Sequence, residues 1–336
     1  MKSFFIFVAA WLVLAACSVR SCDLCACHVV RGSGQKSDRF VVSVSERFTH
    51  FGTMQRDGVR VPDPAVQYLE SMNTQFVLGY QVVEKFRLQL NVPWINRIYR
   101  RPENFSFDSG VDADGDGETD IISGTNMAHG SESGLGNVSV LGNWVAYEKK
   151  EGSFQFSWNV LGGCKFPTGN TAWIGEELDE TEVDGAPDSG IHGHDLALGS
   201  GSFDGIVGTV ISLNWERLFF DAETQYTIRT EGDLSYRYAN DLIWRGGPGF
   251  YTLKGGDGSL GIQAVVSGES KGRDRFRGNR ADDTGITAVY LGPRIVGSWS
   301  ERLDADLGLD LPVSMENTAL QLVPDYRVHA AITWRF

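Results

Sequence analysis

The chain has 336 residues, a formal net charge of -13 and only 22% charged residues, and it contains 40 glycines, 19 Phe, 10 Tyr and 9 Trp. The acidic balance argues against nucleic acid as a partner, because no basic surface is available to neutralise phosphates. After residue 17 no apolar run approaches the roughly 18 to 20 residues that a membrane-spanning helix needs. This excludes a helical membrane protein but not a barrel, whose strands alternate and produce no such run.

The N-terminus has the pattern of an export signal. Lys2 supplies the positive charge, residues 4–14 are apolar, and Ala15 and Ala16 are the small residues of a cleavage point. The mature chain is then expected to begin near residue 17, in an oxidising compartment. We therefore divide the chain into a signal peptide, a Cys-rich N-terminal segment in the periplasm or the lumen, and one outer-membrane barrel: residues 1–16, 17–38 and 39–336.

Four of the five cysteines lie within the eleven residues 17–27, and each has two interpretations. LAAC (14–17) matches a lipobox with Cys17 as the lipidated residue, but lipidated closed barrels are uncommon, so ordinary signal cleavage competes with this hypothesis. Cys22, Cys25 and Cys27 are close enough in sequence to form disulfides. With His28 they are also a ligand set for zinc or copper(I).

The first long connection, residues 49–72, contains one predicted helix. In DPAVQYLESM (63–72), Asp63 is placed as the N-cap and Pro64 lies in the first turn.

Further along, apolar and polar residues alternate with the period of two that is typical of β-strands. FRLQLNVPW (86–94) puts its apolar side chains on one face and Arg87 and Gln89 on the other. Cys164 falls in phase with Trp158 in the strand predicted over 153–166 and is expected to face lipid. Large aromatic residues lie at strand ends, where membrane barrels carry interfacial girdles: Trp94, Trp144, Trp215 and Trp299.

The second long connection contains DADGDGETD, whose alternate acids and following glycine give several hard oxygens on a tightly turning chain. This pattern resembles the start of an EF-hand-type calcium loop. Ser123 stands at the twelfth position, where an EF-hand has a bidentate Glu, so a solvated acidic turn is an equal alternative. The predicted calcium ligands are Asp112, Asp114, Asp116, Glu118 and Asp120.

The third long connection, 167–203, is also acidic and ends near HGHD. His192, His194 and Asp195 have the spacing of transition-metal ligands, although loop histidines beside glycines more often bind nothing. Ser200 and Ser202 lack the strand–helix context of a nucleophile elbow, and no serine lies in a hydrolase motif. We therefore expect no enzyme activity.

The last strand, YRVHAAITWRF (326–336), alternates strictly and ends with aromatic side chains at Trp334 and Phe336. This arrangement resembles the C-terminal signature of bacterial outer-membrane β-barrel proteins, which their assembly machinery recognises. It implies a Gram-negative outer membrane as the location, with outer-membrane lipid and that machinery as partners.

Together the alternating segments predict an all-β fold, an antiparallel transmembrane β-barrel of about twelve strands. The connections are alternately short and long, as in barrels with tight periplasmic turns and long extracellular loops, here acidic. Closure removes the exposed edges of such strands. The predicted strands cover residues 39–48, 73–83, 85–97, 135–148, 153–166, 204–216, 218–230, 236–253, 258–271, 285–299, 302–314 and 326–336.

The inward face follows from the same parity and mixes acids with bases, so that opposite charges can pair across the lumen. Such a lumen either passes a small solute or is blocked by the N-terminal segment. The predicted lumen residues are Arg87, Gln89, Lys165, Asp221, Glu223, Glu269, Arg294, Asp304, Asp306, Asp310, Arg327 and Arg335.

KFPTGN (165–170), before a long acidic loop, is similar to a Lys-x-Pro-Thr-Gly-Asp stretch in the barrel family labelled transporter or MetA-pathway of phenol degradation, with Asn170 in place of the acid. GLGNVSVLGNW (134–144), LGPRIVGSW (291–299) and the Cys-rich N-terminus share this resemblance. It implies an outer-membrane channel for passive passage of small solutes, hydrophobic or aromatic compounds among them. No cofactor is required, and calcium in the loop 112–120 is the one candidate ion.

Two other functions remain open. In one, the barrel is a structural or adhesive surface protein whose calcium-stiffened loop makes the contacts. In the other, the Cys-rich N-terminus binds a soft metal and the barrel is a metal-linked pore.

Overall fold

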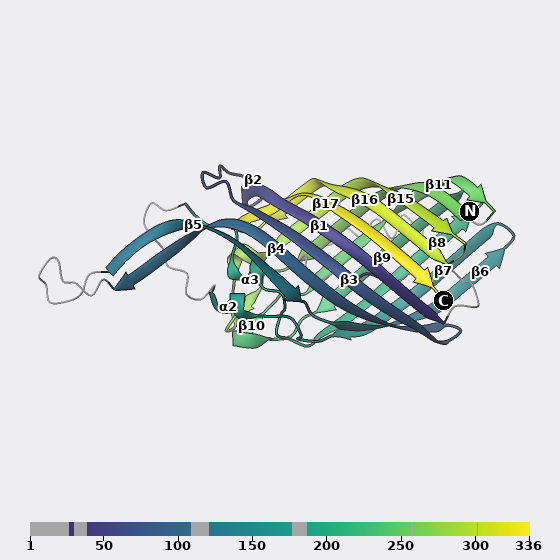
Figure 1. Cartoon of the computed structure of the whole chain (residues 1–336), viewed down its shortest axis with the longest axis horizontal. Coiled ribbons are helices and arrows are strands. Elements are labelled where there is room, and N and C mark those ends of the chain that lie inside the picture. The colour runs from purple at the N-terminus through teal and green to yellow at the C-terminus, as the bar shows by residue number, and fades with distance from the viewer. Residues whose placement is uncertain (1–26, 30–38, 109–120, 177–186, 257, 301) are drawn as a thin grey trace, which may run out of the picture.

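The computed structural model describes residues 27–29, 39–108, 121–176, 187–256, 258–300 and 302–336. It confirms the predicted closed antiparallel barrel of twelve strands (Figure 1). The barrel strands are β1 (Phe40–Arg56), β3 (Tyr68–Val83), β4 (Phe86–Asp108), β6 (Ser139–Glu151), β7 (Phe154–Lys165), β8 (Asp204–Trp215), β9 (Leu218–Ile228), β11 (Asp241–Gly255), β12 (Gly258–Lys271), β15 (Ile286–Trp299), β16 (Leu303–Asn317) and β17 (Leu320–Arg335).

Alternation along these strands sorts side chains between the two faces of the wall. In β4, Leu88 and Leu90 are 43% and 37% exposed on the outside, whereas Gln89 between them is 1% exposed. The tryptophans Trp94, Trp144, Trp215 and Trp299 are all at least half exposed on the outer surface. An apolar exterior around a polar interior is the arrangement of a barrel that is embedded in lipid.

The barrel closes where its first strand meets its last. β1 pairs antiparallel with β17, from Val41 opposite Arg335 to Arg56 opposite Leu320. The Phe336 amide extends this seam by donating to the Phe40 carbonyl oxygen at 2.9 Å. The main-chain groups of both terminal strands are thereby paired, which a closed barrel in lipid requires.

Short connections gather at one end of the barrel, the end at which the C-terminus lies in Figure 1. They are residues 84–85, 152–153, 216–217, 256–257 and 300–302, and this short-turn end matches the prediction. At the opposite, long-loop end one prediction is wrong. β16 and β17 are joined by 318–319 alone, because β17 begins six residues earlier than the alternation of 326–336 indicates.

The second long connection also contains more structure than expected. β4 continues to Asp108, and β5 (Ile121–Leu135) pairs with it in a hairpin that projects beyond the long-loop end (Figure 1). Pairing of β4 with β3 ends at Arg100, so the outer part of this hairpin stands apart from the barrel wall. The sequence obscured it because a strand outside the membrane has no lipid-facing row of apolar residues.

The predicted helix over 63–72 is wrong. Asp63 does accept a hydrogen bond from the Ala65 amide at 3.1 Å, as an N-cap would. However, Val66 has a left-handed backbone with φ of 51°, and from Tyr68 onward the chain pairs with β4 as β3. Pairing with the neighbouring strand overrides the local helical pattern.

Small elements fill the long-loop end. They are β2 (Val59–Arg60), α2 (Ala172–Glu176), α3 (Gly193–Leu196), η1 (Asp233–Ser235), β10 (Tyr236–Arg237), β13 (Arg275–Phe276), β14 (Asn279–Arg280) and η2 (Asp282–Thr284). We refer to the connections 187–203, 229–240 and 272–285 as the cap. In the part of the chain that the structure describes, no helix is long and apolar enough to cross a membrane.

Candidate functional site

The lumen contains a short piece of the N-terminal segment, residues 27–29. Cys27 packs against Leu141 of β6 and Ile206 of β8, while Val29 packs against Leu161 of β7 and Val210 of β8. The Cys27 thiol also lies 3.2 Å from the Ser139 hydroxyl. This segment therefore lies against the inner face of β6, β7 and β8.

Side-chain amides from the strands that flank β6, β7 and β8, namely β3 and β4 on one side and β9 on the other, hold the main chain of this segment. The His28 amide donates to Gln75 Oε1 at 2.8 Å. The His28 carbonyl oxygen accepts from Gln89 Nε2 at 2.6 Å and from Asn91 Nδ2 at 2.9 Å. The Cys27 carbonyl oxygen accepts from Gln225 Nε2 at 2.7 Å. We call Gln75, Gln89, Asn91 and Gln225 the amide clamp.

The space around the segment is small. Cys27 is among the residues that line two cavities, one of about 20 Å³ and one of about 50 Å³. A third cavity of about 60 Å³ lies beneath the cap, and Ile191 and His194 are among its lining residues. A single water needs on the order of 10–15 Å³ of such space. Each cavity therefore holds a few water molecules at most.

Buried ion pairs line the rest of the lumen. Arg294 Nε lies 3.1 Å from Asp306 Oδ1 and donates to His329 Nε2 at 2.8 Å. Arg245 pairs with Glu223 at 3.0 Å. Removing charges from water is costly unless each one has a partner, and these side chains provide partners for one another.

Glu269 connects two more of these groups. Its carboxylate accepts from the Tyr290 hydroxyl at 2.7 Å and pairs with Arg327. The Arg327 guanidinium in turn lies over the Tyr290 ring, 4.3 Å from its centroid. Arg335 pairs with Asp304 nearer the short-turn end.

The cap closes the other end of the lumen through an apolar cluster. Ile191 and Leu196 are fully buried and pack with Leu69, Tyr99 and other inward side chains of the wall. Arg101 of β4 donates to the Ile191 carbonyl oxygen at 3.2 Å. The connection 187–203 is thus folded into the barrel mouth rather than extended into solvent.

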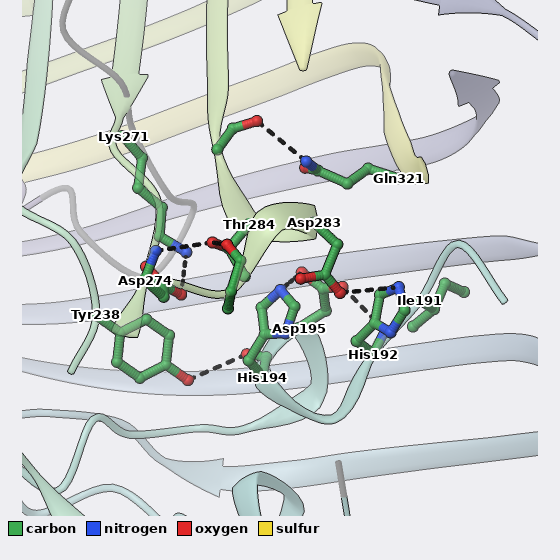
Figure 2. Close-up of polar contacts among 12 residues, drawn as sticks. Ile191, His192, His194, Asp195, Tyr238, Lys271, Asp274, Asp283, Thr284 and Gln321 are labelled. Carbon is green, nitrogen blue, oxygen red and sulfur yellow. Dashed lines mark hydrogen bonds and ion pairs between the residues drawn. The ribbon is translucent and has the colours of Figure 1, made fainter. Parts of the chain in front are cut away.

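Asp274 ties the parts of the cap together. Its carboxylate accepts from Lys271 Nζ at 2.6 Å, from the Tyr236 hydroxyl at 2.8 Å and from the Ala239 amide at 2.7 Å. Its own amide donates to Thr284 Oγ1 at 2.8 Å. Figure 2 shows Asp274 with Lys271 and Thr284, beside the pair of Tyr238 with the His194 carbonyl. One buried carboxylate therefore connects the end of β12, the connection 229–240 and η2.

Two further buried carboxylates, Asp204 and Asp241, anchor the cap to the wall through a shared arginine. Arg229 lies between Asp204 at 2.7 Å and Asp241 at 3.1 Å, and neither Asp side chain is exposed. Ser202 donates to Asp204 at 2.9 Å. The ends of β8, β9 and β11 are joined by this triad.

Two of the motifs that carry the family resemblance, KFPTGN and GLGNVSVLGNW, contact each other. Thr168 of KFPTGN donates to the Gly136 carbonyl at 2.7 Å and accepts from the Val138 amide at 2.8 Å. A Cβ on Gly169 would lie 2.5 Å from the Leu198 carbonyl oxygen, so this close approach requires glycine. KFPTGN therefore lies between the chain that leads into β6 and Leu198 of the cap.

Some residues of the predicted metal sites lie outside the described part of the chain, and the others lie within it. Asp112, Asp114, Asp116, Glu118 and Asp120, and also Cys17, Cys22 and Cys25, lie outside the described residues. In the part that is described, no three His, Cys, Asp or Glu side chains are grouped so as to hold a metal ion. His192 instead lies 3.3 Å from Asp283, and His194 lies 3.4 Å from Asp195 (Figure 2).

The predicted lumen residues lie on the inner face at different depths. Asp221 is partly exposed, as is Asp310, which accepts from Ser267 at 3.2 Å. Arg87 donates to Gln81 near the short-turn end at 3.1 Å. Buried members of the set are Gln89, Lys165, Glu223, Glu269, Arg294, Arg327 and Arg335.

The inward face predicted for FRLQLNVPW contains Gln89 and Asn91 of the amide clamp, whereas sequence reasoning missed Gln75, Gln225 and the apolar wall beside the clamp. Gln75 and Gln225 share the inward parity of their strands, a signal that was present in the sequence. Leu141, Leu161 and Ile206 have the inward parity of their strands as well, but their apolar character counted against an inward position, because apolar side chains in a membrane barrel are expected to face lipid.

No family model matches the sequence, and no curated protein matches it. Among solved structures, an outer membrane channel from Pseudomonas putida F1 is similar, with a TM-score of 0.57 and 13% identity over 92% of this chain and all of that one (100%). The beta domain of the Bordetella autotransporter Brka has a TM-score of 0.42 and 9% identity over 88% of this chain and 99% of that chain. A Pseudomonas aeruginosa FadL homologue has a TM-score of 0.38 and 11% identity over 89% and 91%.

The likeness to the Pseudomonas putida channel concerns the fold. This chain is a closed transmembrane β-barrel of the kind found in outer membranes.

Proposed function

We propose that this protein is an outer-membrane channel for passive passage of small solutes. The observation that carries the proposal is the nature of the groups that fill the lumen. Residues 27–29 and the cap belong to connections, and side-chain contacts hold them to the wall rather than a continuous β-ladder. They can leave the lumen while the twelve strands stay paired.

Several features support the outer membrane as the location. The exterior carries a belt of exposed apolar side chains with tryptophans, as lipid-embedded barrels do. The short-turn end then faces the periplasm and the cap faces the outside. Outer-membrane lipid is the surrounding partner, and the C-terminal strand with Trp334 and Phe336 is the segment presented to the assembly machinery.

The side chains that line the lumen indicate the class of solute. The family resemblance predicts hydrophobic or aromatic solutes. The side chains that touch residues 27–29 on the β3 and β4 wall are amides, and ion pairs line the neighbouring cavity. This lining favours solutes that form hydrogen bonds.

Conductance in planar bilayers tests the proposal. In the Gln89→Leu/Asn91→Leu variant the His28 carbonyl loses both donors, so residues 27–29 are held less tightly and open events become more frequent than in the unaltered protein. Gln263→Leu is the matched control, because this buried amide donates to the Gly247 carbonyl and touches no residue of the segment. Absence of conductance steps in every variant and at every voltage contradicts a channel.

One observation favours a second function. The β4–β5 hairpin projects beyond the barrel (Figure 1), and in the sequence the predicted calcium loop lies between its two strands. A structural or adhesive role would use this hairpin and not the lumen. Loss of surface attachment on hairpin removal, with no conductance in any variant, would support that role instead.

A further inference from the structure

The amide clamp recognises main chain and not a particular side chain. Gln75 accepts the His28 N–H, while Gln89, Asn91 and Gln225 donate to two successive carbonyl oxygens. These are the hydrogen bonds that any extended peptide offers at two neighbouring residues.

The side chains of the segment follow the alternation of an extended chain. Cys27 and Val29, two residues apart, both pack on the apolar wall of β6, β7 and β8. His28 between them points the other way, with its Nε2 3.5 Å from the Ser43 hydroxyl of β1. The lumen at this level is therefore a slot with an apolar side, a polar side and main-chain partners between them.

The slot has unused hydrogen-bonding capacity. Within the described residues, Asn73 Oδ1 and Gln225 Oε1 are buried without a hydrogen-bond partner. Both residues line the cavity of about 50 Å³ beside His28. Two unpartnered acceptors on residues that line this space match the N–H groups of a peptide that extends beyond the three residues seen here.

From these contacts we propose that the amide clamp is a binding site for short extended peptides from solution. In the structure, residues 27–29 of the chain itself occupy this site in place of such a peptide. The favoured ligand has small apolar side chains at alternate positions and a polar residue between them. This inference rests on the proposed channel function, for which it names a solute class.

The first test measures displacement in the full-length barrel. Cys27 is 6% exposed, so a charged, water-soluble maleimide reacts with it only when the segment leaves the slot. We use a protein in which Cys27 is the sole thiol, with Cys17, Cys22, Cys25 and Cys164 changed to Ser. A tethered segment has an effective concentration of about millimolar, so acetyl-Ala-His-Val-amide above that concentration should raise the labelling rate on the order of tenfold.

A matched peptide serves as control. The same peptide methylated on the His amide nitrogen has no N–H for Gln75 to accept, and it should leave the labelling rate unchanged. Equal acceleration by both peptides contradicts the clamp. Acceleration by phenol and not by the peptide assigns the lumen to aromatic solutes and overturns the inference.

The second test makes the site available. His28→Pro removes the N–H that Gln75 accepts while leaving every clamp side chain in place. The segment should be released, and acetyl-Ala-His-Val-amide should then bind at lower concentration than in the unaltered protein and block the conductance. Adding Gln89→Leu/Asn91→Leu to this variant should abolish the block, whereas adding Gln263→Leu should not.

Migration on gels before and after boiling verifies that each variant is a folded barrel. If the variants conduct and the peptide neither accelerates labelling nor blocks, the channel stands and the peptide site is wrong. If no variant conducts but the peptide still accelerates labelling, the site stands and the channel is wrong.

Discussion

At the scale of single residues, the triad of Arg229 with Asp204 and Asp241 joins the cap to the wall through buried charges. Arg229→Leu leaves two carboxylates buried with their shared cation removed. Breaking a buried pair in this way costs about 3–5 kcal/mol. We expect the unfolding midpoint in urea, measured in detergent by loss of the compact gel form, to fall accordingly.

The exposed pair of Arg56 with Asp188 is the control for this prediction. Its nitrogen and oxygen are 2.9 Å apart, but the two side chains are 55% and 68% exposed. A pair in solvent contributes about 0–1 kcal/mol. Arg56→Leu should therefore leave the unfolding midpoint nearly unchanged. An equal fall of the midpoint in both variants would contradict the larger contribution of the buried triad.

At the scale of elements, the outer β4–β5 hairpin is predicted to be dispensable for barrel assembly. Glu103 pairs with Asn126 across the hairpin, so replacing residues 104–125 with Asn-Gly makes a two-residue turn of favoured type. The bond from Arg101 to the cap remains. Heat-modifiable migration and the unfolding midpoint should be those of the unaltered protein, and failure to form the compact gel species would contradict this.

The same replacement tests the predicted calcium loop, because it removes Asp112 to Asp120 together. If these acids bind calcium, calorimetric titration should show heat of binding for the unaltered protein and none for the shortened one. Equal heats in both proteins would place any calcium elsewhere.

The seam between β1 and β17 predicts a role for the last residue. Phe336 donates to Phe40 at the end of the seam, and its ring lies 5.9 Å from that of Trp334 on the outer surface. Deleting Phe336 removes a main-chain pair and a lipid-facing ring, so the yield of assembled barrel in outer membranes should fall several-fold. Phe336→Tyr keeps both features and should assemble normally; equal yields for the deletion and for Tyr would contradict the role.

Comparison of these elements shows what a sequence can predict in such a barrel. Where a strand crosses lipid, as β4 does at Leu88 and Leu90, membrane and lumen impose the alternation directly. At Tyr68–Met72 neither the membrane nor the lumen imposes an alternation of apolar and polar residues. YLESM therefore has a helical pattern, but its pairing with β4 makes it a strand. The elements outside the lipid were therefore the ones that the sequence misassigned.

At the scale of the whole molecule, the filled lumen depends on contacts between distant segments. Gln75 and Gln225 are 150 residues apart in the chain, and both reach the main chain of residues 27–28. Parity assigns each to the inner face, but which groups meet across the lumen depends on strand order and stagger. A sequence alone predicted that the N-terminal segment lies in the periplasm or the lumen, and it gave no partner for it.

In the proposed channel, the segment 27–29 and the cap close the lumen in series, and this arrangement predicts how changes to the two combine. The segment 27–29 and the cap lie at different levels of one lumen, so the larger of their two resistances limits the current. Asp274→Ala leaves Lys271 and Tyr236 without their shared acceptor and loosens the cap, while Gln89→Leu/Asn91→Leu loosens the segment. We expect each change alone to raise the mean conductance modestly, and the two together to raise it by more than the product of the separate factors. A combined effect equal to that of one change alone would mean that only one of the two elements closes the path.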